Sequence, residues 1–113
     1  MPERVKKFKE EREKLNKLIL GRDNLDIKRF FGIDGSVYRD GALTARTKEM
    51  LGLTASLVLR CDDCIAYHLI QLKQLEVADK EFDEIMAVAL VVGGSITIPH
   101  IRRAYQLWEE LKG

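Results

Sequence analysis

Apolar side chains recur every three or four positions along most of the chain, which is the period of an α-helix. This pattern predicts helices over residues 2–20, 24–31, 44–59, 61–75, 79–93 and 96–112. No segment alternates apolar and polar residues as a half-buried strand would. The sequence therefore predicts an all-α fold, a compact bundle of five to six antiparallel helices that forms one domain over residues 1–113.

Local signals mark several helix ends. Thr44 is predicted to cap the third helix, because a threonine hydroxyl can accept a hydrogen bond from a free amide of the first turn. Asp79 is predicted to cap the fifth helix in the same way, and Gly93-Gly94 to end it. Residues 32–41 are predicted to form a loop because they are rich in glycine and aspartate. From Met50 to Leu59 there is no charged side chain, so we expect that helix to be buried on most of its surface.

The predicted N-terminal helix is basic and only thinly apolar. Residues 1–22 carry eight Lys or Arg against four Glu, and the two signs are interleaved. Such interleaving favours a solvated outer face over an acidic binding partner. Because its apolar stripe is interrupted at Arg12, we expect this helix to lie across the body or against another subunit.

Composition is typical of a globular protein. The chain is 46% hydrophobic and 33% charged, and its net charge of +1 provides no general attraction to nucleic acid or to an anionic membrane. The longest apolar run, Ile85 to Val92, is eight residues, whereas a membrane-spanning helix needs about 20. Because the N-terminus lacks a signal-peptide pattern, we expect a cytoplasmic protein.

Both cysteines and one of the two histidines lie between residues 61 and 68. On a helix Cys61, Cys64 and His68 share a face, and the two cysteine Cα atoms would lie about 5 Å apart, close enough for a disulfide. In a reducing compartment such a pair is more often catalytic or metal-binding than structural. Glu49 adjoins the uncharged run and is either a partly desolvated proton carrier or a first-turn glutamate favoured by the helix dipole.

Four short motifs give the chain a resemblance to a known family. They are Asp40-Gly41-Ala42-Leu43, Arg46-Thr47-Lys48-Glu49, Cys61-x-x-Cys64-x-x-x-His68, and Val77-Ala78-Asp79 before an acidic helix start. Their order resembles the carboxymuconolactone decarboxylase superfamily. The glutamate, the paired cysteines and the histidine are similar to its alkyl hydroperoxidase D branch, and the resemblance covers residues 30–104 as the family core.

The resemblance implies an alkyl hydroperoxidase D-like, all-helical fold that assembles as a homotrimer or homohexamer and acts as a thiol-dependent peroxidase or disulfide oxidoreductase. By this resemblance Cys64 attacks a hydroperoxide and Cys61 resolves the resulting sulfenic acid as a disulfide. An external dithiol, in some relatives a lipoyl-bearing protein, then reduces the disulfide. His68, helped by Glu49 through water, carries the proton that activates Cys64. No bound cofactor or metal is implied.

The residues around the cysteines leave the order of attack open. Cys61 is nearer to the helix start, whose dipole lowers the pKa of a thiol, whereas the resemblance favours Cys64 as the attacking sulfur. Asp62 and Asp63 oppose thiolate formation unless they point to solvent or pair with Arg60.

The distance between Glu49 and His68 is a further constraint. Twelve residues of unbroken helix place Glu49 about 18 Å from Cys61, and the returning helix recovers about 10 Å by His68. We therefore expect a water bridge, a break near Gly52 or a contact from a neighbouring subunit in place of a direct bond.

Three other functions fit parts of the pattern. Lactone decarboxylation names the superfamily, although the members with that activity do not rely on a cysteine pair. A structural zinc site could use both cysteines, His68 and His100, but zinc-binding cysteines usually lie on a turn. In a non-enzymatic oligomeric binding protein the cysteines would be ordinary core residues. Tyr38 and Tyr67 fit either a pocket or the core, and His100 fits a pocket, surface or capping role.

Overall fold

The computed structural model describes residues 2–113, and these form six α-helices and one 3₁₀ turn without any strand. The elements are α1 (Glu3–Gly21), α2 (Leu25–Val37), α3 (Ala45–Val58), α4 (Asp62–Gln74), α5 (Asp79–Gly93), η1 (Ser95–Thr97) and α6 (Ile98–Lys112). The predicted all-α class is confirmed. Among the helices of this range, none is both long and apolar enough to cross a membrane.

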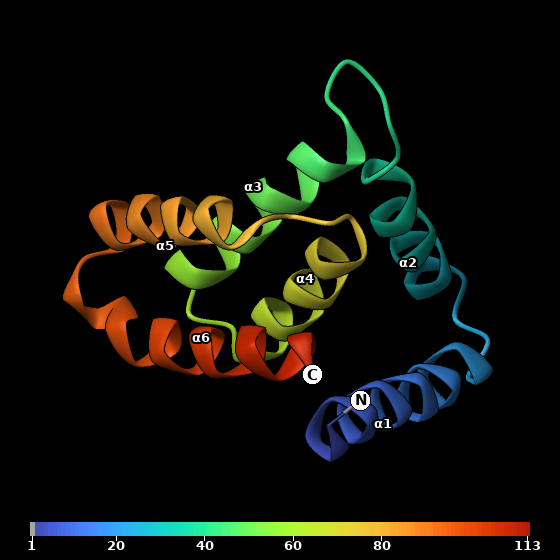
Figure 1. Cartoon of the computed structure of the whole chain (residues 1–113). Helices are drawn as coiled ribbons and strands as arrows, with labels where there is room; N and C mark the ends of the chain where they lie inside the picture. Colours follow the sequence, from blue (N-terminus) through green and yellow to red (C-terminus); the bar gives the residue numbers. More distant parts are fainter. Residues whose placement is uncertain (1) are drawn as a thin grey trace.

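Helices α3 to α6 form the body of the molecule (Figure 1). Helix α3 packs against α4 and α5, and α4 packs against α6 as well. All four contribute to one core, in which the rings of Phe82 and Trp108 stack with their centroids 4.6 Å apart. The fully buried side chains of the body include Leu53, Leu57, Leu69, Leu72, Phe82 and Trp108.

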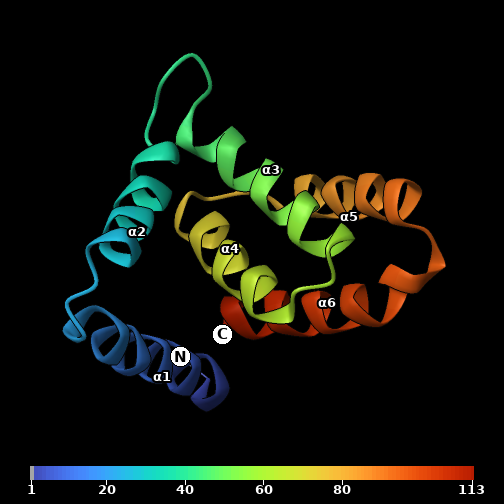
Figure 2. The same cartoon turned by 180° about the vertical axis from the view of Figure 1, so that it is seen from behind.

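Helices α1 and α2 lie to one side of this body, as the views from both sides show (Figures 1 and 2). The start of α1 is anchored, because Val5 is buried in the core and Arg4 forms an ion pair of 3.0 Å with Glu110 of α6. Between Leu15 and Val37 most apolar side chains are exposed, and α2 has no buried residue. We call residues 15–37 the arm.

One predicted feature of the arm is wrong. Helix α2 continues through Gly32 and Gly35 to Val37, where a loop was predicted, because isolated glycines cost a helix only about 1 kcal/mol each. Helix α3 is buried or partly buried at most positions from Met50 to Val58, as predicted, with Leu51 and Ala55 exposed. The continuation of α2 leaves apolar side chains such as Ile33 and Val37 exposed on the single chain.

The helix caps follow the sequence at α3 but not at α5. The Thr44 side chain accepts a hydrogen bond from the Thr47 amide, as predicted. The cap of α5 is Ala78 and not Asp79, because the carboxylate of Glu81 accepts the Ala78 amide hydrogen bond. Asp79 instead accepts hydrogen bonds from side chains of α6, the ring nitrogen of Trp108 at 2.9 Å and Nζ of Lys112 at 2.8 Å. It thus ties the start of one helix to the end of another.

The turn between α3 and α4 places the cysteines. Arg60 has a φ of 59°, in the left-handed region, and its amide donates to the Leu57 carbonyl. The Cys61 amide donates to the Ser56 carbonyl, which completes a Schellman motif. The chain therefore reverses within three residues, and Cys61 both leaves α3 and caps α4.

Candidate functional site

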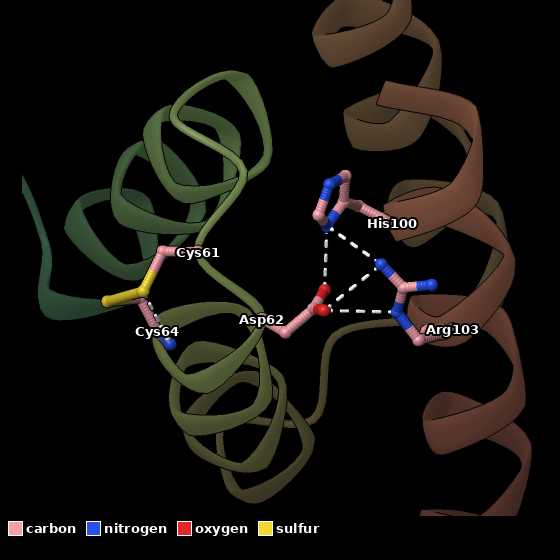
Figure 3. A network of polar contacts seen from close by, with 5 residues as sticks. All are labelled: Cys61, Asp62, Cys64, His100 and Arg103. Carbon is pink, nitrogen blue, oxygen red and sulfur yellow. Dashed lines mark hydrogen bonds and ion pairs between the residues drawn. A yellow bond between two sulfur atoms is a disulfide. The ribbon is translucent and has the colours of Figure 1, made fainter. Parts of the chain in front are cut away.

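The two cysteines lie at the start of α4 and are joined by a disulfide (Figure 3). Their Cα atoms are 5.3 Å apart, close to the separation expected from helix geometry. Cys61 is the N-cap of α4, and its sulfur accepts a hydrogen bond from the Cys64 amide at 3.3 Å. Cys61 is partly exposed and Cys64 is exposed, so neither is an ordinary core residue.

Glu49 and His68 form a buried pair one helical turn beyond the disulfide. The Nδ1 atom of His68 lies 2.6 Å from Oε2 of Glu49, and the residues are only 7% and 5% exposed. A carboxylate that accepts a hydrogen bond from Nδ1–H fixes the orientation of the ring and stabilises the imidazolium when it forms. The pair can therefore take up and release a proton next to the sulfurs.

This direct bond overturns the expectation of an indirect contact. Helix α3 is continuous from Ala45 to Val58, so no break occurs at Gly52. The sequence estimate counted helical rise through residues 59–61, but there the chain turns from one helix to the other. Gly52 also lets the helices approach, because a Cβ atom at that position would lie 2.6 Å from Cε1 of His68. The imidazole of His68 therefore occupies the space that a side chain at position 52 would fill.

Two tyrosines flank the imidazole of His68. The rings of Tyr38 and Tyr67 each have their centroid 5.5 Å from that of His68. Burial, and next the negative charge of Glu49, raise the pKa of both hydroxyls, so both stay neutral donors at physiological pH. Tyr38 is held in place because Nζ of Lys48 donates to the carbonyls of Val37 and Arg39, at 2.8 and 2.6 Å.

A small cavity of about 130 Å³ opens beside the sulfurs. It adjoins a larger, open cleft of about 560 Å³ between α1 and α2, which has Phe8, Leu15, Phe30 and Phe31 among its lining residues. The guanidinium of Arg12 lies 4.0 Å above the ring of Tyr67 at the junction of the two. A small molecule could reach the sulfurs through this cleft. The cavity is lined by Arg12, Asp34, Asp63, Cys64, Tyr67 and His68.

The two aspartates that follow Cys61 point in different directions. Asp63 is exposed and lines the cavity. Asp62 pairs with His100 and Arg103 of α6, and not with Arg60, which was one of the two possibilities that the sequence left open. Burial raises the pKa of the Asp62 carboxyl, but the hydrogen bonds from His100 and Arg103 together outweigh it and leave the pKa below its usual value.

The zinc ligands considered from the sequence do not form one cluster. Within residues 2–113, no group of three or more His, Cys, Asp or Glu side chains could hold a metal ion. His100 lies on α6, where its Nδ1 is 2.8 Å from Asp62, whereas Nδ1 of His68 contacts Glu49. The two histidines thus belong to separate polar pairs.

A model of the carboxymuconolactone decarboxylase family matches residues 27–107, which is most of the chain. The chain belongs to this family. Two curated relatives are similar over about three quarters of their length. An uncharacterized protein of Cupriavidus necator is 24% identical over 82 residues, which are 73% of each chain. The uncharacterized protein 4 in the cox locus of Paracoccus denitrificans is 25% identical over 84 residues, 74% of this chain and 76% of its own.

Solved structures of the family share the fold. A crystal structure of TM1620 from Thermotoga maritima superposes with a TM-score of 0.92 at 55% identity, over 95% of this chain and 94% of that one. A second crystal structure of TM1620 describes it as a family member and a candidate for the antioxidative response, with a TM-score of 0.90. A Legionella pneumophila protein of the family, 23% identical, has a TM-score of 0.85 over 99% of this chain and supports the fold alone.

Several residues of this family member's site carried no signal in the sequence. Arg12 and Asp34 come from helices far from the cysteines in sequence, so only the fold brings them to the cavity. The link from Asp62 to Arg103 spans 41 positions. Gly52 was noticed only as a possible break, although a glycine can equally mark a close approach of two helices.

Proposed function

We propose that this family member is a thiol-dependent peroxidase or disulfide oxidoreductase that reduces hydroperoxides with the Cys61–Cys64 pair. The observation that carries the proposal is the position of an accessible dithiol pair beside the buried Glu49–His68 pair. A base close to a thiol raises the fraction of thiolate, which is the reactive form. The description of TM1620 as an antioxidative-response candidate supports the same class of function.

The reaction begins when His68 takes the thiol proton of Cys64, directly or through water in the cavity, while Glu49 stabilises the imidazolium. The thiolate attacks one oxygen of the hydroperoxide, so that an S–O bond forms and the O–O bond breaks. Cys64 becomes a sulfenic acid, and the leaving alkoxide takes the proton from His68. The products of this step are an alcohol, or water when hydrogen peroxide is the substrate, and a neutral His68.

The second step closes the disulfide. The sulfur of Cys61 attacks Cys64, the S–O bond breaks, and water leaves with the proton of Cys61. Together the two thiols supply two electrons and two protons to the hydroperoxide. An external dithiol, for example a lipoyl group, then exchanges with the disulfide and is itself oxidised.

The exposure of the two sulfurs favours Cys64 as the attacking residue. Cys64 is exposed and lines the same cavity as His68, whereas Cys61 is the partly covered N-cap of α4. A resolving thiol needs only to reach the neighbouring sulfur, which the 5.3 Å between the Cα atoms permits.

The proposal includes assembly with further copies of this chain, as a trimer or hexamer. A helix as short as α2 is marginal in water without tertiary packing, yet none of its residues is buried within the chain. Burying one large apolar side chain contributes about 1.5–3 kcal/mol, so an interface over the arm would stabilise it substantially. The exposed apolar residues of the arm are Leu15, Leu18, Ile19, Leu25, Ile27, Phe30, Ile33 and Val37.

The test is the consumption of hydrogen peroxide and of cumene hydroperoxide with dihydrolipoamide as the reductant. The wild-type protein is expected to consume both, and a Cys61→Ser/Cys64→Ser variant to consume neither above background. Equal consumption by the variant would refute the proposal. The same variant is also incubated with carboxymuconolactone, since turnover there would support decarboxylation in its place.

A further inference from the structure

Asp62 is a charged residue next to the reactive pair that the proposed reaction does not use. It follows Cys61 directly, and neighbouring Cα atoms are about 3.8 Å apart. A negative charge so close to a sulfur disfavours the thiolate. The first turn of a helix nevertheless attracts carboxylates, so Asp62 remains ionised beside the thiols.

The structure directs this charge away from the sulfurs. Figure 3 shows the carboxylate of Asp62 turned toward α6, on the side of the helix start opposite to the disulfide. One carboxylate oxygen lies 2.8 Å from Nδ1 of His100, and the other accepts from Nε of Arg103 at 3.0 Å. A terminal nitrogen of Arg103 lies 3.0 Å from the same oxygen and 3.1 Å from Nδ1 of His100, so the three side chains form one network.

We propose that Arg103 and His100 are positioning residues that hold and neutralise the charge of Asp62, and so keep Cys61 and Cys64 reactive. The guanidinium supplies the compensating charge, and the imidazole fixes the second oxygen. The network acts through Asp62 and does not touch the reacting atoms. This inference rests on the proposed redox function, but it concerns thiol acidity and can be tested without any peroxide.

Other charged groups line the cavity beside Cys64. Asp63 lies on the same helix, Arg12 comes from α1 and Asp34 from α2, and all three line the cavity. Behind them lies the Glu49–His68 pair. These groups stay in place in the variants below, so any change in reactivity reports the charges at positions 62 and 103.

The experiment measures the alkylation rate of the reduced protein against pH, together with the midpoint potential of the Cys61–Cys64 pair. Arg103→Gln leaves the Asp62 charge uncompensated, so alkylation at pH 6 is expected to slow about threefold, the effect of one unit charge in a water-exposed site. Asp62→Asn is expected to speed it by a similar factor. The double variant restores neutrality and is expected to match the wild type.

The midpoint potential is expected to move with thiol acidity. Stabilising the reduced, thiolate form makes a dithiol pair more oxidising, so Asp62→Asn raises the potential and Arg103→Gln lowers it. A threefold change in the thiol–disulfide equilibrium corresponds to about 14 mV for a two-electron couple. Arg103→Lys keeps the charge and is expected to stay close to the wild type.

If the alkylation rate and the midpoint potential change in opposite directions in Arg103→Gln and Asp62→Asn, the network acts by charge compensation and not only as a structural link. Both substitutions break the same ion pair, so a structural role predicts changes of the same sign. Changes of the same sign, or no change in Arg103→Gln, would overturn the inference. Arg102→Gln makes the same substitution one position away, at an exposed site on α6, and is expected to change nothing. If peroxide reduction fails while these shifts occur, only the proposed activity is lost.

Discussion

The body buries a large apolar core within the chain, although residues such as Leu59 and Val91 on its surface are exposed, whereas the arm buries almost none of its apolar side chains. In the body, four helices turn large residues such as Leu53, Phe82 and Trp108 toward one another and leave almost none of their surface exposed. In the arm, Phe30 is 68% exposed and Leu18 is 62% exposed. The body therefore has a core of its own, whereas the arm buries little apolar surface within the chain, and the proposed assembly would supply that burial.

The candidate site lies where these two regions meet. The disulfide, His68 and Glu49 come from the body, where helix packing fixes them. Asp34 and Tyr38 come from α2 and the residue that follows it, so assembly would also set the shape of the cavity. The proposed chemistry thus lies on the body, and access to it depends on the arm, whose apolar residues are proposed to form the subunit interface. Four predictions test this division.

The largest effect on peroxide consumption is expected from removal of the sulfur that attacks the peroxide. Cys64→Ser is expected to lower peroxide consumption by about 10³-fold or more, since the nucleophile is lost. Cys61→Ser, the matched variant, is expected to complete one turnover and to stop as a sulfenic acid at Cys64, which mass spectrometry detects as one added oxygen. Full activity in Cys64→Ser would contradict the role assigned to Cys64, and the reverse pattern would exchange the two roles.

Next is the integrity of the assembly. Phe30→Asp places a charge at the most exposed phenylalanine of the arm, where burial in an interface would leave that charge without a partner. Sedimentation is expected to show single chains in place of a trimer or hexamer. Lys14→Asp, at an exposed polar position of α1, serves as the control and is expected to keep the assembly. An unchanged mass in Phe30→Asp would show that the arm is not the interface.

Substitutions in the Glu49–His68 pair are expected to lower activity less than loss of the nucleophile Cys64. His68→Ala removes the base, and the alkylation rate of Cys64 at neutral pH is expected to fall about 10²-fold. Glu49→Gln is expected to have a smaller effect, because the amide oxygen can still accept a hydrogen bond from Nδ1–H. Stopped-flow alkylation measures both rates. The pair does not act as proposed if Glu49→Gln costs more than His68→Ala.

The smallest effect tests the close approach of α3 and α4. In Gly52→Ala the added Cβ would lie 2.8 Å from the Tyr38 hydroxyl and 2.9 Å from Nε2 of His68. Overpacking of this kind costs about 1–3 kcal/mol in the free energy of unfolding, and moving the imidazole is expected to slow alkylation about tenfold. Gly21→Ala, where nothing lies within 4 Å of the added atom, is expected to be neutral or slightly stabilising. Similar results for the two variants would contradict the packing role of Gly52.

The sequence predicted the helices of the body but missed the end of α2 in the arm, and within the body it placed the cap of α5 at Asp79 where the structure has Ala78. Periodicity gave the helices of the body and the Thr44 cap correctly, because their apolar faces meet other parts of the same chain. The prediction was wrong over residues 32–37. Glycine and aspartate there suggested a loop, but the structure has a helix whose apolar side chains are exposed. A pattern of side chains shows which face is apolar, but not whether that face is covered by the same chain or by another one.

Within the site, local spacing predicted the pairing of Cys61 with Cys64 but not the contact of Glu49 with His68. Positions three residues apart on one helix have a fixed geometry, so the 5.3 Å between the cysteine Cα atoms followed from the spacing. The distance between residues on two helices depends on the turn that joins them, and Arg60 gives no sign in the sequence that it adopts a positive φ. Contacts set by turns and by helix crossings therefore had to come from the structure.

The central claim is that peroxide joins Cys61 to Cys64, and intact-mass measurement of the reduced protein tests it most directly. After addition of a small excess of hydrogen peroxide and before any reductant, the chain is expected to lose two hydrogen atoms in mass, and the addition of dihydrolipoamide to restore them. The Cys61→Ser/Cys64→Ser variant is expected to keep its mass throughout. A wild-type chain that gains oxygen without losing hydrogen, or that remains unchanged, would contradict the account.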